Sequence, residues 1–350
     1  MLYPKLINIR RLAALAGLVL AMLLSMPGDG ARAQAPAVLV RFSHVVAPDT
    51  PKGRMALRFK ELVEQRAAGR IRVEVYPDSQ LYGDDDEMEA LRLGAVELLA
   101  PSLSKLGNFG VPEFEVFDLP FLFSDLAQVR LVTQGPIGQQ LLQRLGRQQM
   151  QGLGFLDNGF KQMSASRPLR TPADYKGQRL RVQASRVLVA QMRALGALPV
   201  VLPFAETQRA LASGVVDGTE NPLSNFLTQG LASVQPDVTL TQHGYLGYAV
   251  VTNPRFWASL STADRDLLTG ALADALVMGN RLSAQLNQQA LEQLRRNPAV
   301  RIHEVTPPER EALKLAVQPV HDAFQRSVGP ELLDEVQQAI RPQTQTQDSD

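Results

Sequence analysis

Cysteine is absent from the 350 residues, and the chain has one tryptophan and four histidines. The missing cysteines exclude disulfides, a thiol nucleophile, a thiolate metal site and a lipid-modified cysteine anchor. An excess of one charge is also missing, because 36 basic residues against 35 acidic ones leave a net charge of +1. That balance argues against a nucleic-acid-binding protein. The length predicts two domains with enough apolar residues for a sizeable core.

Catalytic and cofactor motifs are missing as well. The histidines, at positions 44, 243, 303 and 321, lie far apart and have no partner at metal-ligand spacing. The chain contains no P-loop, complete dinucleotide-binding fingerprint or Gly-x-Ser-x-Gly elbow. We therefore expect that the protein binds no cofactor and is not an enzyme. A triad assembled from distant residues leaves no local signature, which keeps a periplasmic hydrolase as an alternative.

The N-terminus has the pattern of an export signal. Basic residues at Lys5, Arg10 and Arg11 precede an apolar run over 12–24, and Ala31-Arg32-Ala33 supplies a cleavage site. We therefore predict a signal peptide over residues 1–33, cleaved after Ala33, with a retained anchor as the alternative. The remaining residues have 32 basic and 34 acidic groups, a net charge of −2. No later segment reaches the length of a membrane span, so we expect a soluble protein in the periplasm.

Apolar patterning after the signal predicts alternating strands and helices, and thus an α/β protein with a mostly parallel sheet. Asp84 is predicted to cap a solvated helix start that runs through Glu87 to Leu93. A turn is predicted at residues 157–159, and a polar, disordered tail at residues 341–350. The expected strands are 38–43, 70–76, 95–100, 152–156, 160–166 and 178–182, and the expected helices are 51–66, 84–93, 126–149 with a break at 135–136, 187–195 and 261–296.

The stretch from Asp157 to Asn225 is the most specific part of the chain. It resembles the solute-binding proteins of tripartite ATP-independent periplasmic (TRAP) transporters, and the DctP branch, associated with C4-dicarboxylates such as malate, succinate and fumarate, is the most similar. The resemblance extends over about residues 38–340. Further matching segments are Phe42–Val46, Thr50–Gly53, Val73–Pro77, Ala100–Lys105, Asp118–Phe123 and His243–Tyr248.

The resemblance implies a two-lobed periplasmic-binding-protein-like fold with a hinge, crossing strands and a long lobe-bridging helix. One lobe would contain residues 36–158 and 247–286, and the other residues 159–246 and 287–340. Hinge motion would close the lobes around the ligand. The predicted helix from Ser261 has the length of the bridging helix.

The same resemblance implies a carboxylate-binding site. Arg181 matches the family's carboxylate-binding arginine, whose guanidinium offers two parallel N–H donors to a carboxylate. Lys161 stands where some sugar-acid-binding relatives have arginine. Asn221 matches a ligand-contacting position, although it is also placed to cap a helix opened by Pro222. Phe204 matches a pocket-lining aromatic, with a core role as the alternative.

Further candidates follow from their places along the chain. Lys52 is the candidate for a second cation after the first strand, and Ser102 and Lys105 follow the third strand at an edge where ligands bind. Tyr245 and His44 are weaker candidates. For the lysines a solvated surface role is the alternative, and for Tyr245 and His44 a buried structural role.

These expectations combine into a binding function. The protein would capture a small dianion, close around it and deliver it to TRAP membrane permease subunits, with transport energy supplied by an ion gradient. Two alternatives stay open: a keto, mono- or aromatic acid as the cargo, and a sensor-kinase ectodomain as a partner.

Overall fold

The structure, a computed structural model of the chain, describes residues 38–341. The predicted signal peptide and all of the predicted tail except Arg341 lie outside these residues. Within the described range, no helix combines the length and apolar character that crossing a bilayer requires.

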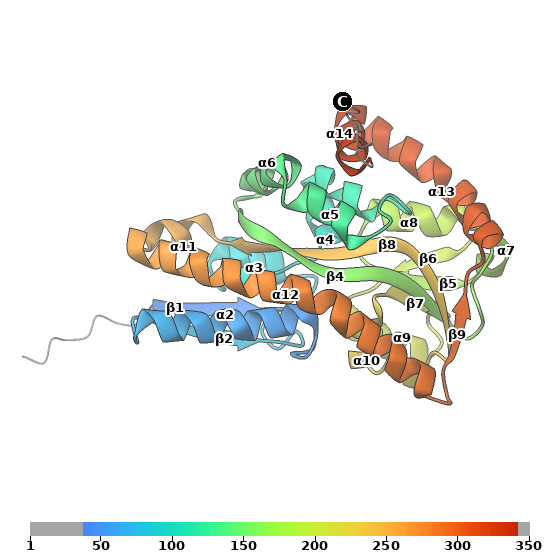
Figure 1. Cartoon of the computed structure of the whole chain (residues 1–350), viewed down its shortest axis with the longest axis horizontal. Helices are drawn as coiled ribbons and strands as arrows, with labels where there is room; N and C mark the ends of the chain where they lie inside the picture. The colour runs from blue at the N-terminus through green and yellow to red at the C-terminus, as the bar shows by residue number, and fades with distance from the viewer. Residues whose placement is uncertain (1–37, 342–350) are drawn as a thin grey trace, which may run out of the picture. The chain divides into compact units, whose positions relative to one another are not determined.

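A single mixed sheet of nine strands organises residues 38–341 (Figure 1). Its strand order is β2-β1-β3-β8-β4-β7-β5-β6, and β9 pairs with β8. The strands are β1 Val38–Ser43, β2 Ile71–Tyr76, β3 Leu98–Leu99, β4 Gln151–Ala165, β5 Arg179–Val182, β6 Leu198–Val201, β7 Gly218–Asn221, β8 Asp237–Thr252 and β9 Arg301–Glu304.

The direction of the strands changes across this sheet. Strands β2, β1 and β3 are parallel, and so are β7, β5 and β6. The two long strands β4 and β8 lie between these groups and run antiparallel to each other and to their neighbours β7 and β3. The expectation of a mostly parallel sheet therefore fails at the centre, where two long strands cross from one parallel group to the other.

Helices pack around this sheet, and α2, α5, α6, α8, α10 and α12 begin within a residue of a predicted position. The α-helices are α2 Pro51–Ala67, α3 Glu87–Leu93, α4 Leu103–Asn108, α5 Leu126–Thr133, α6 Pro136–Arg144, α7 Pro172–Tyr175, α8 Arg186–Ala194, α9 Thr207–Ala212, α10 Leu223–Thr228, α11 Pro254–Ser259, α12 Thr262–Arg296, α13 Pro307–Val328 and α14 Pro330–Ile340. Short 3-10 helices are η1 Pro112–Asp118, η2 Leu145–Gln148, η3 Phe204–Glu206 and η4 Leu231–Ser233.

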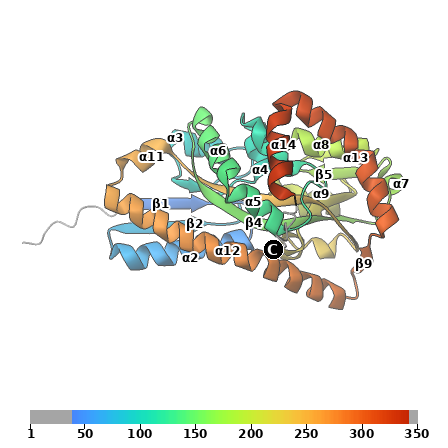
Figure 2. The ribbon, with the colours of Figure 1, turned by 45° about the horizontal axis from the view of Figure 1, so that its top comes forward.

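Helix α12 joins the two groups of parallel strands. Its start is capped by Ser261, whose hydroxyl accepts the N–H of Asp264 at 3.1 Å. The first part packs with α2 and β4 in one apolar cluster, and Ala290 and Leu294 near its end pack in a second cluster with α10. Figure 2 shows the helix running past α2 and β4 toward β9. A Cβ at Gly279 would lie 2.7 Å from the Leu156 side chain, so the glycine permits close packing on β4.

The predicted turn at residues 157–159 is wrong. Strand β4 continues through it with register shifts against β8, so Asp157-Asn158-Gly159 forms a bulge. Gly159 has φ +137, and a Cβ there would lie 2.7 Å from the Asn287 amide nitrogen on α12. The sequence predicted a turn here because a bulge and a turn both require the conformational freedom of a glycine.

Candidate functional site

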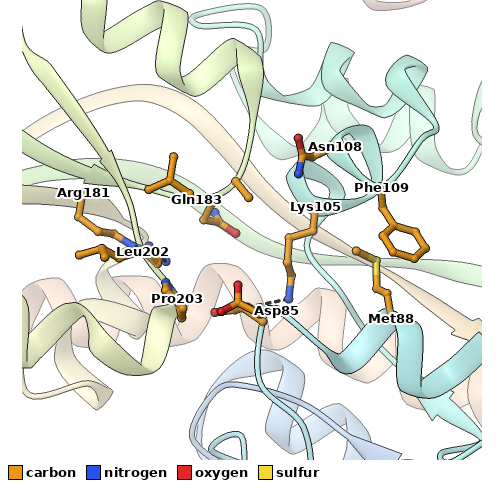
Figure 3. Close-up of a pocket in the computed structure, with 12 residues that line it drawn as sticks. Asp85, Met88, Lys105, Asn108, Phe109, Arg181, Gln183, Leu202 and Pro203 are labelled. Atoms are coloured by element: carbon orange, nitrogen blue, oxygen red, sulfur yellow. Dashed lines mark hydrogen bonds and ion pairs between the residues drawn. The ribbon is translucent and has the colours of Figure 1, made fainter.

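Two adjacent cavities lie where α3 and α4 approach the ends of β5 and β6. The larger one encloses about 300 Å³ and is lined by Met88, Lys105 and Phe109 on one side and by Arg181, Leu202 and Pro203 on the other (Figure 3). The smaller cavity encloses about 20 Å³ and shares four residues with the larger: Asp84, Lys105, Arg181 and Gln183. It is also lined by Val45, Val46, Lys52, Ser102, Phe204, Asn221, Asn225, Leu246 and Tyr248.

Arg181 projects from β5 into both cavities. Its side chain is only 2% exposed, and its Nε and Nη2 donate to the same carbonyl oxygen, that of Leu202, at 2.9 and 2.8 Å. Burial lowers the pKa of Arg181, but an arginine stays charged in proteins. Among residues 38–341 no carboxylate forms an ion pair with it. The two parallel N–H donors of this buried cation therefore bond to a neutral carbonyl oxygen, although their geometry suits a carboxylate.

Lys52 is a second buried cation at the smaller cavity. It lies in the first turn of α2, where Thr50 caps the helix by accepting the Gly53 N–H at 3.1 Å. Its Nζ donates to the Ala100 carbonyl at 3.0 Å and lies 3.9 Å from the centre of the Tyr248 ring. Burial lowers the pKa of Lys52 from 10.5 to about 7, although the nearby acidic groups oppose this shift. No carboxylate of the described residues forms an ion pair with Lys52.

Lys105, in contrast, is fully paired. Its Nζ donates to Asp84 at 2.6 Å and to Glu87. Burial alone would lower the pKa of Lys105, but these two carboxylates raise it above its usual range. The Lys105 charge and hydrogen bond likewise outweigh burial at Asp84 and lower the pKa of that carboxyl to about 2.

The predicted solvated helix start at Asp84 is therefore wrong. Helix α3 begins at Glu87 after Asp86, and the side chain of Asp84 turns inward to Lys105 and to the backbone N–H of Phe204. Glu87 is fully buried, and burial raises its pKa.

Lys161 and Asn221 occupy different surroundings on neighbouring strands. Lys161 on β4 pairs with Glu220 on β7 at 2.8 Å, and the second oxygen of Glu220 bonds to His243 Nε2 at 2.7 Å. The Lys161 charge and the hydrogen bond with His243 outweigh burial and lower the pKa of Glu220 to about 2. Successive side chains of a strand point to opposite faces, so Asn221 reaches the smaller cavity while Glu220 points to Lys161. Lys161 does not line either cavity.

Asn221 does not cap helix α10, so the alternative role predicted for it is wrong. Helix α10 begins at Leu223, and Pro222 occupies the cap position without a side-chain hydrogen bond. The side-chain nitrogen of Asn221 instead lies 3.5 Å from the Thr219 hydroxyl.

The remaining candidates separate into two groups. Ser102 and Phe204 line the smaller cavity, and the Ser102 hydroxyl is buried without a hydrogen-bond partner among the described residues. Tyr245 lies outside both cavities, in a cluster of aromatic rings, and donates to Asp157 at 2.7 Å. His44 is fully buried outside the two cavities, and burial lowers its pKa to about 3, so its ring is neutral.

Several cavity residues were not predicted from the sequence, above all Asp84, Gln183 and Tyr248. Two of them follow from strand periodicity. Gln183 lies two residues after Arg181 and shares its side, and Leu246 and Tyr248 share a face of β8 that excludes Tyr245. The Tyr248 hydroxyl is also buried, and it has no hydrogen-bond partner among residues 38–341.

The smaller cavity thus gathers two cations and several polar groups that lack carboxylate partners. Buried charges are costly unless they are paired, so the chemistry of Arg181 and Lys52 is suited to an anion. Within the described residues no cluster of acidic and histidine side chains has the arrangement of a metal site.

Comparison with known proteins agrees with this fold. Residues 42–327 match the family DctP, bacterial extracellular solute-binding protein family 7. The C4-dicarboxylate-binding periplasmic protein DctP of Rhodobacter capsulatus is 47% identical over 331 residues, which cover 94% of this chain and 98% of that protein.

Two solved structures are similar along most of their length. A TRAP periplasmic solute-binding protein from Shewanella oneidensis with bound succinate has a TM-score of 0.85 and 42% identity, covering 87% of this chain and 100% of that one. Another from Pseudomonas aeruginosa with bound L-malate has a TM-score of 0.79 and 41% identity, covering 82% and 99%.

The fold is therefore that of the two-lobed TRAP solute-binding class. The chain belongs to the DctP family of bacterial extracellular solute-binding proteins. This confirms the family and the two-lobed α/β fold that the resemblance implied. The protein is a transport component that binds a small molecule outside the cytoplasm and works with TRAP permease subunits. The residue roles and lobe boundaries stay predictions.

Proposed function

We propose that this protein binds a C4-dicarboxylate, such as succinate or malate, across the two adjoining cavities and releases it unchanged to a TRAP permease. The observation that carries the proposal is that Arg181 and Lys52, two buried basic side chains without carboxylate partners among the described residues, line the same cavity. A dianion with two carboxylates matches two such cations. The similar proteins with bound succinate and L-malate support the same ligand class.

Each carboxylate of the ligand would have its own donors. The first would take the two N–H groups that Arg181 now directs to the Leu202 carbonyl. The second would lie near the Lys52 ammonium. The hydroxyls of Ser102 and Tyr248 and the amide of Asn221 line the same cavity and are suited to hydrogen-bond carboxylate oxygens.

We further propose that closure moves residues 36–158 and 247–286 against residues 159–246 and 287–340. Two smaller apolar clusters each lie mostly within one of these parts: one joins β1, α2 and the start of α12, and the other joins α9, α10 and the end of α12. The largest apolar cluster extends across both parts, so closure would have to keep its packing or rearrange it. Closure would exclude water from the cavity and strengthen each charged hydrogen bond. The closed form would then engage the permease, with a sensor-kinase ectodomain as a further proposed partner.

Export to the periplasm, with cleavage after Ala33, completes the proposal. The extracellular family supports export, and the basic, apolar and small-residue segments of the N-terminus support the signal.

A thermal-shift panel of organic acids tests the proposed ligand class. Succinate and malate should raise the melting temperature, and butyrate, with one carboxylate, should not. Equal shifts with succinate and butyrate would reject the dicarboxylate. Mass analysis of the acid recovered from the complex should return it unchanged, whereas a product would indicate an enzyme.

A further inference from the structure

Asp84 connects the two sides of the binding cavities. It lies between β2 and α3, and its Oδ1 accepts from Lys105 Nζ at 2.6 Å. Its Oδ2 accepts from the backbone N–H of Phe204, which lies just after β6 on the opposite side. The two segments are 120 residues apart in sequence.

The donors that Asp84 occupies are suited to a ligand carboxylate. An ammonium and a backbone N–H are the groups that bind carboxylates in proteins, and Asp84, Lys105, Phe204 and Arg181 all line the smaller cavity. Lys105, the Phe204 N–H and Arg181 together outweigh burial and lower the pKa of Asp84, so its carboxyl is ionised at neutral pH. Asp84 is therefore an ionised carboxylate of the protein itself, inside a cavity suited to a ligand carboxylate.

The start of α3 does not depend on the side chain of Asp84. This helix begins at Glu87 with Asp86 at its cap position, and the helix-end contact of Asp84 is instead with the first N–H of η3 across the cavity. Lys105 has a second carboxylate partner in the fully buried Glu87, so it stays paired if Asp84 loses its charge. The side chain of Asp84 thus makes contacts that neither the helix nor Lys105 requires.

We propose that Asp84 is an affinity-determining residue that competes with the ligand for the donors of the cavity and bridges its two sides until a ligand displaces it. This inference rests on the proposed function. A dicarboxylate must break the contacts of Asp84 with Lys105 and Phe204 or accept the repulsion of a nearby carboxylate, and either effect weakens binding.

The test compares Asp84→Asn with Asp86→Asn by calorimetry with succinate at pH 7. Both variants remove one negative charge from the same loop, but Asp86 is exposed and lines neither cavity. Asp84→Asn should lower the Kd about tenfold, and Asp86→Asn should change it less than twofold. Unchanged or weaker binding by Asp84→Asn would overturn the proposal, and weaker binding would indicate that Asp84 positions Lys105 for the ligand. If wild-type protein and both variants bind no C4-dicarboxylate, the proposed function fails instead.

A second measurement requires no ligand. Small-angle X-ray scattering of ligand-free protein should give a larger radius of gyration for Asp84→Asn than for wild type and Asp86→Asn, because the bridge to Phe204 is weakened. Equal radii for the three proteins would contradict the bridge. Circular dichroism and thermal unfolding of each variant confirm that the comparison uses folded protein.

Discussion

Replacing Lys52 by methionine should stabilise the ligand-free protein and remove tight binding of a dicarboxylate. The Lys52 ammonium is buried, has no ion pair with a carboxylate of the described residues, and contacts the Ala100 carbonyl and the face of the Tyr248 ring. Methionine retains a similar unbranched stem and removes the charge. The same substitution at Lys314, an exposed residue on α13, serves as a control.

The size of the effect follows from the pKa of Lys52. Folding lowers that pKa from 10.5 to about 7, and one pKa unit corresponds to 1.36 kcal/mol, so the charge opposes folding by roughly 4 kcal/mol at pH 7. The lost hydrogen bond to Ala100 offsets about 2 kcal/mol of this. The expected net stabilisation is about 2 kcal/mol, a rise in Tm of roughly 3–6 °C.

The pH dependence has a definite sign. Because the folded pKa lies below the unfolded one, the unfolded chain binds more protons between pH 7 and 10.5, and the stability of the wild type rises with pH in that window. The advantage of Lys52→Met should therefore be complete below about pH 7 and vanish near pH 9, where the remaining charge penalty equals the roughly 2 kcal/mol of the lost hydrogen bond.

Urea unfolding of wild type, Lys52→Met and Lys314→Met at pH 6, 8 and 10 measures this dependence, and calorimetry with succinate measures binding. Lys52→Met should bind at least tenfold more weakly. A variant that is less stable than wild type at pH 6, or an advantage that grows with pH, would refute the assignment of Lys52 as a buried cation without an ion-pair partner.

Three further predictions concern the anchor, the buried ion pair and the export signal. Arg181→Lys should weaken succinate binding at least tenfold, about 1.4 kcal/mol, because one ammonium cannot replace two parallel donors. The control variant Arg179→Lys, at the exposed start of β5, should bind as the wild type does, and equal affinities of wild type and Arg181→Lys in calorimetry would reject Arg181 as the anchor. Glu220→Gln should lower the free energy of unfolding by about 3–5 kcal/mol, because it leaves the Lys161 ammonium buried without its partner. In urea titrations the double variant with Lys161→Met should recover much of that loss, and additive losses from the two substitutions would contradict the pairing. The secreted protein should begin at Gln34, and an intact mass that includes Met1 would contradict cleavage.

The order of helices and strands could be predicted to a large extent from the sequence. Residues 38–43, the helix after Pro51 and the long helix after Ser261 appear as β1, α2 and α12 with bounds within about a residue of the prediction. These elements depend on local periodicity, caps and helix-breaking residues. The prediction failed at the bulge near Gly159 and at Asp84, where contacts with distant segments outweigh the local pattern.

The candidate site was predicted only in part. Arg181, Lys52, Lys105, Ser102, Asn221 and Phe204 line one cavity, whereas Lys161, Tyr245 and His44 lie outside it. A list of polar residues at strand ends cannot separate these groups, because the side on which each side chain lies depends on strand register. Tyr245 and Tyr248, three residues apart on β8, show the consequence: only Tyr248 lines the cavity.

The sequence by itself determined the family, the absence of thiol chemistry, the predicted export signal and most of the element order, since these depend on residues close together in the chain. Only the tertiary structure decided which cations have acidic partners. Lys161 meets Glu220 from 59 residues away, and Lys105 meets Asp84 and Glu87, but within residues 38–341 no carboxylate pairs with Arg181 or Lys52. Charge pairing depends on distances of a few ångströms between segments that folding brings together, so the arrangement of paired and unpaired charges that suits the cavity to an anion arises only in the folded chain.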